Sequence, residues 1–466
     1  MAEGVPTASV VQHCNKHQKF FLQWFLSNDR RIIYLTGGPG SGKSWCIKLV
    51  AQQAKKQNLS LICCGMTAQA TLQLPSTRVH VPSHKRWTEL PPNTFDGTLM
   101  SPRDAYKDQR DLVVVVDECG MMTVDQGQRL MSRYALARIL LVGDPAQLQP
   151  VNGVAFVGSH DYTKARQAHG REQLAEVVLG VQMRIASDDP DGQLLSDFLR
   201  DLRLGKFTRC VETVMHMLSQ APPFDPSKSP DAIVVAFTNQ DVGETNRAYT
   251  EIFAAMHEYD KIWFPVVMSK VLDRARFYGD HTSGMAGPFC RGVRCIITKN
   301  IKEDGRIVGA NNQPVVMCQK LTPDGGPAKP GAPIVSVDMG PGGVTLLNAG
   351  ADGGPPIRVG VAGTVWCVQG VTTTRQLYVN LRMCTGDGLY VAMSRVKRFS
   401  QLAGASNYDR DRLIRVLETP SPARIISNEI IGRARKAKQR RMQAMFKRQH
   451  AQKRKGDASP KRPRVA

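Results

Sequence analysis

The sequence predicts an α/β protein built on a parallel sheet, and three short apolar segments carry this prediction. Residues 32–35, 112–116 and 139–142 are runs of bulky apolar side chains, as expected of strands that are buried on both faces. Each run is followed at once by glycine-rich or polar residues, and the sequence between the runs has room for helices. Because ligands bind at the carboxyl ends of parallel strands, the same segments indicate where a site would form.

The first apolar run leads into a phosphate-binding loop. Residues 37–44 fit the pattern G-x-x-x-x-G-K-[ST], and residues 45–54 contain no glycine or proline, so a helix can begin after the loop. Backbone N–H groups and the positive end of that helix would surround the phosphates. Lys43 would contact the β- and γ-phosphates, and Ser44 would supply an oxygen to Mg²⁺. The predicted nucleotide-binding residues are Gly37, Gly38, Pro39, Gly40, Ser41, Gly42, Lys43 and Ser44.

Two acids and a glutamine follow the other apolar runs. Asp117 and Glu118 come directly after residues 112–116, where desolvated carboxylates need a cation beside them. Asp117 is the predicted Mg²⁺ ligand, and Glu118 is the predicted base that activates water. Gln147 follows residues 139–142 and is predicted to contact the γ-phosphate or its attacking water. The phosphate loop, the Mg²⁺ ligands, the base and the γ-phosphate contact together predict hydrolysis of a nucleoside triphosphate.

Composition predicts a soluble intracellular protein with a polyanionic partner. The chain has 466 residues, a net charge of +22 and no apolar run long enough to cross a bilayer. Its 11 cysteines include no C-x-x-C pair, which favours reduced thiols over zinc or disulfides. Residues 419–466 hold 15 lysines and arginines against two acids, so this segment contributes +13 of the total.

Flanking residues near the phosphate loop are candidates for base and nucleic-acid contacts. Residues 11–26 read as a helix, and Gln18 within it has the donor and acceptor needed to read an adenine edge, although a solvated helix face is an equal alternative. Residues 75–110 look like an irregular insertion. His84 and Trp87 in that insertion could stack on bases, but a surface loop is the stronger interpretation.

A second unit is predicted to begin near residue 172. Residues 194–204 have helical spacing, residues 233–237 read as a strand, and Thr238 and Asn239 at its end are candidate nucleic-acid contacts. Further predicted elements are a β-rich region over residues 287–360 and strand-like sequence over 364–371 and 377–379.

The C-terminal residues change in composition. Residues 429–452 could form a basic helix, and two basic clusters, 453–455 and 460–464, are typical of a nuclear localisation signal. A disordered nucleic-acid arm and a solubilising tail are the alternatives. Nuclear import receptors are the partners that the first interpretation predicts.

With these residues in view, the chain resembles a superfamily 1 DNA helicase of the RecD/Pif-like branch over residues 15–400. The motifs that carry the resemblance stand in the family's order: the phosphate loop, Thr67-Ala68, Val116-Asp117-Glu118, residues 143–151, Gln182-Met183-Arg184, residues 291–309, Val368-Gln369-Gly370-Val371-Thr372, and Tyr390 to Arg395. Met66 replaces the proline that family members carry before Thr67, and the usual histidine before Gln369 is absent.

The resemblance implies a fold of two tandem RecA-like domains, residues 1–165 and 166–415, with an SH3-like β insertion at 287–360 and a basic, largely disordered tail at 416–466. It implies that Arg184 and Arg395 act as arginine fingers, that Gly370 lies at the nucleotide, and that Thr67 and Thr372 contact nucleic acid. It also implies ATP and Mg²⁺ as cofactors, single-stranded DNA and its junctions with duplex as substrates, and 5′ to 3′ movement in replication, recombination or repair beside replication proteins.

Other functions remain compatible with the same residues. An RNA helicase of the positive-strand virus type shares the phosphate loop and the Gly-Asp-Pro sequence, whereas the nuclear-type tail and Ser394-Arg395 favour DNA. A translocase that never separates strands has the same motifs. A scaffold with a vestigial ATPase is disfavoured by the complete catalytic set. A compact basic motor with a nuclear tail is typical of a DNA virus or mobile element.

Overall fold

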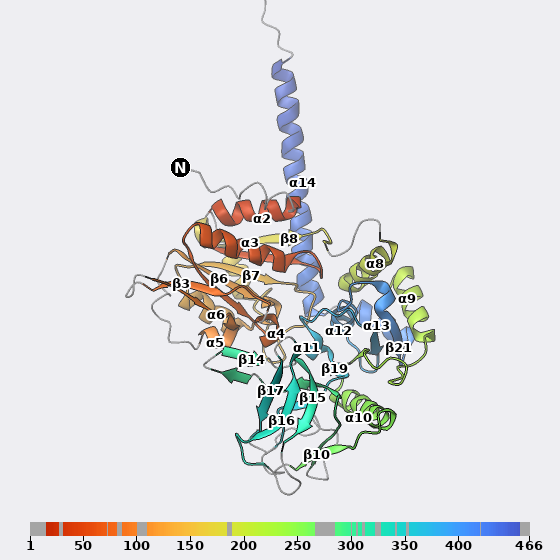
Figure 1. The fold of residues 1–466 in the computed structure, drawn as a ribbon. Coiled ribbons are helices and arrows are strands. Elements are labelled where there is room, and N and C mark those ends of the chain that lie inside the picture. The colour runs from red at the N-terminus through yellow and green to blue at the C-terminus, as the bar shows by residue number, and fades with distance from the viewer. Residues whose placement is uncertain are drawn as a thin grey trace, which may run out of the picture.

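The computed structural model contains two α/β domains, a small β domain that contacts the second of them, and a long C-terminal helix (Figure 1). The structure describes residues 15–27, 31–71, 73–81, 86–99, 110–183, 189–265, 285–299, 301–303, 306–309, 313–321, 328–340, 343–350, 354–419 and 421–456. None of the helices in these ranges is both long and apolar enough to span a bilayer.

The first domain is a mostly parallel sheet with helices on both faces. Its strands are β1 (Ile32–Gly37), β2 (Ser60–Gly65), β3 (Thr77–Val81), β4 (Arg86–Leu90), β5 (Asn93–Thr94), β6 (Leu112–Asp117), β7 (Arg138–Gly143) and β8 (Leu174–Leu179). The order across the sheet is β4-β3-β2-β6-β7-β1-β8, with β5 paired to β2. Strands β2, β6, β7, β1 and β8 are parallel, so the three predicted apolar runs lie side by side as central strands.

Alternate residues of these strands fill two separate cores. The helices are α2 (Lys16–Ser27), α3 (Lys43–Lys56), α4 (Ala68–Thr71), α5 (Phe95–Leu99), α6 (Val124–Arg133) and α7 (His160–Gln167). Ile33 and Leu35 of β1 pack with α2 and α3, whereas Ile32 and Tyr34 pack with α5, α6 and α7 on the other face. Burial on both faces explains why these strands are continuous apolar runs in the sequence.

Two parts of the first domain differ from the sequence-based expectation. Residues 75–110, expected to be irregular, contain the antiparallel hairpin β3–β4, in which Thr77 and Val79 are buried while Arg78 and His80 are half-buried. Strand β8 extends the sheet beyond residue 165, where the first domain was expected to end, and pairs along the whole of β1. Strands β3, β4 and β8 each contain a charged residue, so they lack the continuous apolar runs that mark the central strands.

The second domain is a smaller parallel sheet. Its strands are β9 (Ile233–Ala236), β19 (Ala362–Thr364), β20 (Leu377–Asn380) and β21 (Leu402–Ser406), in the order β19-β9-β20-β21. Its helices are α8 (Pro190–Leu204), α9 (Arg209–Gln220), α10 (Asn239–Met256), α11 (Val365–Val368), α12 (Gly386–Met393) and α13 (Arg410–Glu418). Helix α11 occupies half of the segment 364–371 that was expected to be a strand.

The predicted β insertion is present and shares a core with helix α10. It contains β10 (Ile262–Pro265), β11 (Met285–Phe289), β12 (Arg294–Ile297), β13 (Ile301–Glu303), β14 (Arg306–Gly309), β15 (Pro314–Lys320), β16 (Pro333–Asp338), β17 (Val344–Asn348) and β18 (Ile357–Val359). Five of these strands form an antiparallel sheet in the order β17-β16-β15-β12-β18. Tyr249 of α10 packs with Met317 and Val335 of this sheet, which joins the insertion firmly to the second domain.

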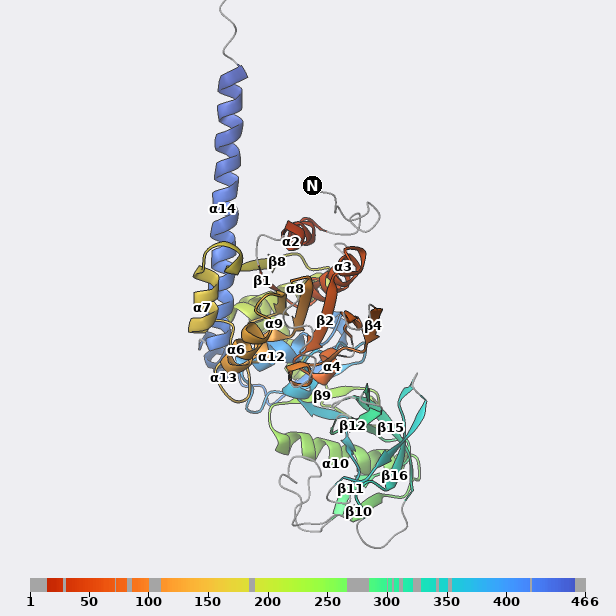
Figure 2. The same cartoon turned by 90° about the vertical axis from the view of Figure 1, so that its left-hand side faces the viewer.

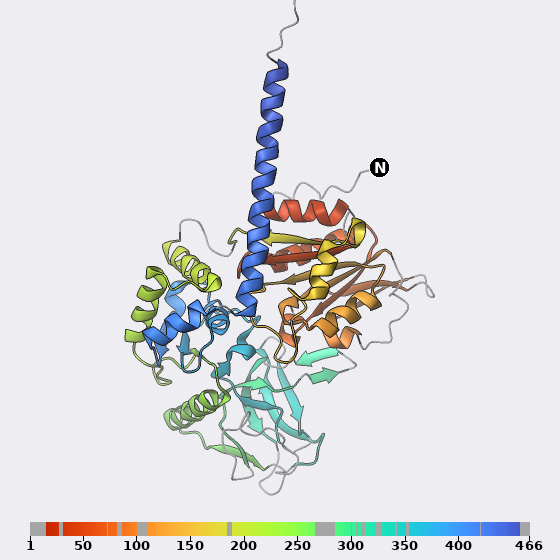
Figure 3. The same cartoon turned by 180° about the vertical axis from the view of Figure 1, so that it is seen from behind.

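The C-terminal segment begins as a packed helix. Helix α14 (Pro422–Gly456) starts earlier than the basic helix expected over 429–452, and Ala423 and Ile430 on it are buried against the body. Its later turns project away from both domains in every view (Figures 1–3). The expected tail without a core of its own therefore corresponds to the part beyond these first turns, and the second basic cluster at 460–464 lies outside the described residues.

Gly127 of α6 provides a test of the first domain's packing. A Cβ at Gly127 would overlap the ring of Phe156, so Gly127→Ala should lower the free energy of unfolding by about 1–3 kcal/mol. Helix propensity alone predicts the opposite sign, a gain of about 1 kcal/mol. Gly432→Ala is the matched control, because a Cβ there meets nothing within 4 Å. Urea unfolding measures both variants, and a Gly127→Ala protein as stable as Gly432→Ala would contradict this packing.

Candidate functional site

The phosphate loop joins β1 to α3 in a conformation that only glycine allows at its turns. Gly42 caps α3 with a φ of 88°, in the left-handed region, and a Cβ there would overlap the Gln18 amide. A Cβ at Gly37 would lie 2.8 Å from the carbonyl oxygen of Leu179. Lys43 Nζ donates to the carbonyl oxygens of Gly37 and Gly38 at 2.7 and 3.1 Å, so its charge lies inside the loop.

Asp117 and Glu118 lie at the carboxyl end of β6, beside this loop. Asp117 accepts a hydrogen bond from the backbone N–H of Glu118 at 2.9 Å. Glu118 has a φ of 56°, which costs a non-glycine residue roughly 1–3 kcal/mol and is typical of functional sites. Thr67 Oγ1 donates to Glu118 Oε2 at 3.1 Å. The surrounding structure therefore holds Glu118 in one strained orientation.

Burial changes the acidity of both carboxyl groups. Desolvation and the adjacent Asp117 charge raise the pKa of Glu118 to about 7, partly offset by the Thr67 hydroxyl, Arg395 and Lys43. Desolvation also raises the pKa of Asp117, against the Glu118 N–H bond and Lys43. A carboxylate with a pKa near neutrality is suited to accept a proton from water at physiological pH.

These residues line one cleft of about 360 Å³ between the two α/β domains. The first domain contributes the phosphate loop, Trp45, Asp117, Glu118 and Gln147, whereas Gly370, Thr372, Ser394 and Arg395 come from the second. A Cβ at Gly370 would lie 2.8 Å from Glu118 Oε1, so glycine is what permits this close approach of the two domains.

Arg395 is held in the cleft by its own domain. It follows α12, and its guanidinium donates to the carbonyl oxygens of Val391 and Val371 at 2.8 and 3.1 Å and to Ser394 Oγ at 2.6 Å. Its charge is close enough to Glu118 to lower the pKa of that carboxyl group. The guanidinium is therefore oriented in advance and presented to the cleft.

A buried carboxylate, Asp144, joins the two domains directly beside the phosphate loop. Asp144 Oδ1 accepts from Arg203 Nη2 of α8 at 2.8 Å, and Oδ2 accepts from the Tyr390 hydroxyl of α12 at 2.7 Å. Burial raises the pKa of Asp144, but Arg203, Lys43 and Tyr390 outweigh burial and hold the pKa below its usual value. The sequence gives Asp144 no role beyond its motif, and Arg203 and Tyr390 carry no signal that pairs them with it.

The segment before Arg184 also contacts the phosphate loop. Met183 N donates to the Gly40 carbonyl oxygen at 2.8 Å, and Gln182 Nε2 donates to that of Pro39 at 2.6 Å. Arg184 itself lies outside the described residues. Gln18 is buried beside Gly42, and its Oε1 accepts from the Asn15 backbone at 3.1 Å. The structure therefore places Gln18 next to the loop, as its predicted role requires.

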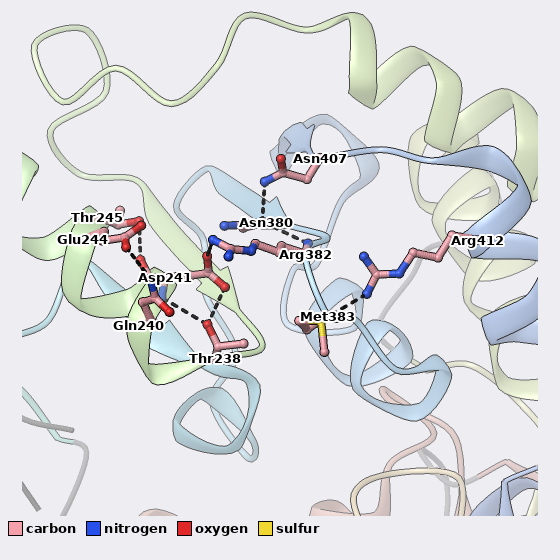
Figure 4. Close-up of polar contacts among 10 residues, drawn as sticks. All are labelled: Thr238, Gln240, Asp241, Glu244, Thr245, Asn380, Arg382, Met383, Asn407 and Arg412. Carbon is pink, nitrogen blue, oxygen red and sulfur yellow. Dashed lines mark hydrogen bonds and ion pairs between the residues drawn. The ribbon is translucent and has the colours of Figure 1, made fainter. Parts of the chain in front are cut away.

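The predicted nucleic-acid residues lie in different places. Thr67 contacts Glu118 and Thr372 lines the cleft, so both belong with the nucleotide site. Thr238 lies at the carboxyl end of β9, where its hydroxyl caps α10 by accepting from Asp241 N at 3.1 Å and donates to the Asp241 carboxylate. Arg382 Nη1 contacts the same carboxylate at 3.2 Å (Figure 4).

This edge of the second sheet presents polar and basic side chains to solvent. Asn239 is exposed at the start of α10, and Arg382 is exposed after β20. Arg412 of α13 is half-buried and lies near Met383 (Figure 4). His84 lies outside the described residues, so its predicted contact stays a prediction. Its neighbour Trp87 on β4 stacks under the Arg78 guanidinium, with 3.8 Å from Cζ to the ring centroid.

Comparisons with known proteins agree with the motifs. Residues 13–178 match the family model described as an AAA domain. The ATP-dependent RecD2 DNA helicase of Deinococcus radiodurans is 35% identical over 128 residues, which cover 26% of this chain and 16% of that protein. The residues matched by the family model include the phosphate loop, Asp117-Glu118 and the Asp144 motif. The chain spans less than a fifth of the length of the Deinococcus relative.

Solved structures of Pif1 helicases share the whole fold. The Pif1 helicase of Candida albicans has a TM-score of 0.61 at 15% identity, covering 90% of this chain and 99% of that one. Bacteroides Pif1 bound to single-stranded DNA has a TM-score of 0.60 at 14% identity, covering 91% and 97%. The predicted fold, two tandem α/β domains with a β insertion in the second, is thereby confirmed.

The pKa of Glu118 generates a prediction about pH. If Glu118 is the base, it must be ionised, so kcat/KM for ATP should fall about tenfold between pH 8 and pH 6 around an apparent pKa of about 7. Thr67→Ala removes a bond that lowers this pKa, so its profile should move to higher pH. Glu118→Gln should lose roughly 10²-fold or more in kcat. A profile flat from pH 6 to 8 in the wild type would exclude this role.

Tyr390 tests the junction between the domains. Tyr390→Phe removes a donor from the buried Asp144 carboxylate, so the free energy of unfolding should fall by about 1–3 kcal/mol. We also expect a lower kcat, because α12 carries Arg395 just beyond its end. Urea unfolding and steady-state hydrolysis measure the two effects. Tyr259→Phe, at an exposed ring, is the control, and equal behaviour of the two variants would contradict the junction.

Proposed function

We propose that the chain is an ATP-dependent DNA helicase or translocase of superfamily 1. The observation that carries the proposal is the cleft between the domains. One wall holds a phosphate loop and a half-buried carboxylate pair, and the other holds a buried arginine that follows α12. Because each domain supplies only part of the catalytic set, hydrolysis depends on the approach of the two domains, as a motor requires.

Each side chain in the cleft has a definite role in hydrolysis of ATP. Lys43 stabilises negative charge on the β- and γ-phosphates, and Gln147 orients the attacking water. Glu118 accepts the proton of that water, because its raised pKa keeps it basic near neutrality. Arg395, and Arg184 by resemblance, stabilise the charge that develops on the γ-phosphate, a contribution of roughly 10³ to 10⁵ in rate.

Asp117 and Ser44 fit a role as Mg²⁺ ligands. Asp117 is half-buried, and Lys43 is the cation whose charge acts on it, so a divalent ion would relieve its desolvation. Among the described residues no group of three or more histidine, cysteine or acidic side chains could hold a metal by itself. This agrees with Mg²⁺ that is bound mainly through phosphate oxygens and water, where it would neutralise developing charge.

DNA is the substrate that the relatives favour. The relative in Deinococcus radiodurans is named a DNA helicase, and the Pif1 structures include complexes with single-stranded DNA and forked duplex DNA. The net charge of +22 supports a polyanionic partner. We propose that single-stranded DNA contacts Asn239 and Arg382 at the edge of the second sheet, and that movement is 5′ to 3′.

The cellular setting is a proposal from the sequence. The basic clusters at 453–455 and 460–464 support import into a nucleus by import receptors, and in a viral protein into the host nucleus. Work in DNA replication, recombination or repair, beside replication proteins, follows from the proposed activity. A second candidate is an RNA helicase of the positive-strand virus type, which the shared Gly-Asp-Pro sequence favours.

ATP hydrolysis with and without nucleic acid tests the proposal. We expect single-stranded DNA to stimulate hydrolysis more than RNA of the same length, and Lys43→Ala to abolish turnover while DNA binding persists. Lys48→Ala removes the same charge from the exposed face of α3 and should behave as wild type. Duplexes with a 5′ or a 3′ tail then report polarity. Greater stimulation by RNA supports the second candidate, and turnover unchanged in Lys43→Ala rejects the site.

A further inference from the structure

The first turns of α14 bury one face of that helix. Ala423, Ser427 and Ile430 are fully buried and follow one another at helical spacing, and Arg424 is 3% exposed. The buried face lies against both α/β domains, because α14 packs on β8 of the first and on α8 of the second. In the views of Figures 1 and 3 the helix rises from the line where the two domains meet.

One end of this face is fixed to the second domain at α12. Arg424 Nε lies 3.2 Å from Asp387 Oδ1, and Ser421 Oγ donates to the same oxygen at 2.8 Å. A Cβ at Gly386 would overlap the Arg424 guanidinium, so glycine at the start of α12 leaves the space that this side chain occupies. Asp387 is in the first turn of α12, and Arg395 follows the end of the same helix.

The other end is fixed to the first domain. Ile430 belongs to the core beneath β1, β6 and β7, and Ile426 packs on Gly158, where a Cβ would lie 2.5 Å from it. Arg433 forms a bidentate pair with Glu176 of β8, at 2.9 Å through Nε and 2.7 Å through Nη2. Glu176 also accepts from the Tyr162 hydroxyl at 2.7 Å, which holds the carboxylate in position.

The contacts at the two ends of this face differ in how many of their polar atoms form hydrogen bonds. Arg424 Nη2 and Ser427 Oγ are buried without a hydrogen-bond partner within the described part of the chain. An unpaired buried polar group costs about 1–3 kcal/mol, so stability alone does not account for these side chains at this position. A polar anchor on α12 is what a positioning role requires.

We propose that residues 421–433 are a strap that positions Arg395 of the second domain relative to the phosphate loop of the first. The anchors at Arg424 and Arg433 are nine residues apart on one helix, a separation of roughly 14 Å that a helix keeps rigid. The strap thus links β8, which pairs along β1 up to the phosphate loop, with the helix that leads to Arg395. Arg424 and Arg433 are positioning residues, and the inference rests on the proposed function.

Arg433→Ala tests the strap at its half-exposed anchor, where misfolding is least expected. The nucleotide pocket of the first domain stays intact, so KM for ATP should change less than about twofold, while kcat falls about three- to tenfold. Arg433→Lys keeps the charge and one donor, so it should recover part of kcat. Arg435→Ala removes an equal charge from the exposed side of the same helix and should match wild type.

A distance measurement separates failure of the strap from failure of the proposed function. Labels attached through unnatural amino acids at the exposed positions Gln167 and Met217 report the separation of the two domains without any hydrolysis. We expect a broader distance distribution in Arg433→Ala than in Arg435→Ala. Equal distributions and equal kcat in these two variants would overturn the strap, as would a change in KM alone. A wild type without nucleic-acid-stimulated hydrolysis would overturn the proposed function. The distance distributions would still test the strap, because they do not depend on hydrolysis.

Discussion

The contact of Asp144 with Arg203 and Tyr390 is the interaction on which the arrangement of the two domains depends. The carboxylate is fully buried, so it must be paired, and both partners belong to the other domain. Ala146 and Leu148 from the same loop enter the core of the second domain and exclude water from this pair. The loop after β7, which also carries Gln147 into the cleft, is thus held by the second domain.

The chemistry of the cleft follows from where strands end. β1 and β6 are parallel strands of one sheet and their carboxyl ends lie on the same edge, so Lys43 and Asp117 meet without any special arrangement of the chain. Glu118 is different, because its backbone is left-handed, its side chain accepts a hydrogen bond from Thr67, and its carboxylate lies close to Gly370 of the second domain. Both domains therefore surround the Glu118 carboxylate.

The C-terminal helix changes in character along its length. Its first turns are apolar on one face and bridge the domains, with Ile430 in the core of the first. After Glu429 the helix sequence contains no acidic residue up to Gly456, so like charges repel along this part. A polyanion would neutralise this charge, which agrees with the import or nucleic-acid role that the composition favours.

The sequence by itself determined the elements whose signals are local. Strands buried on both faces appear as apolar runs, and the residues that touch phosphate follow them within a few positions, so β1, β6, β7, Lys43, Asp117 and Glu118 could be predicted. The hairpin β3–β4 and strand β8 could not, because charged residues such as Glu176 interrupt their patterns and are paired only by distant parts of the chain. The partners of Asp144 and the anchors of α14 were likewise decided only in the tertiary structure. An ion pair between residues far apart in sequence leaves no periodicity, and its energy exists only after folding removes both charges from water.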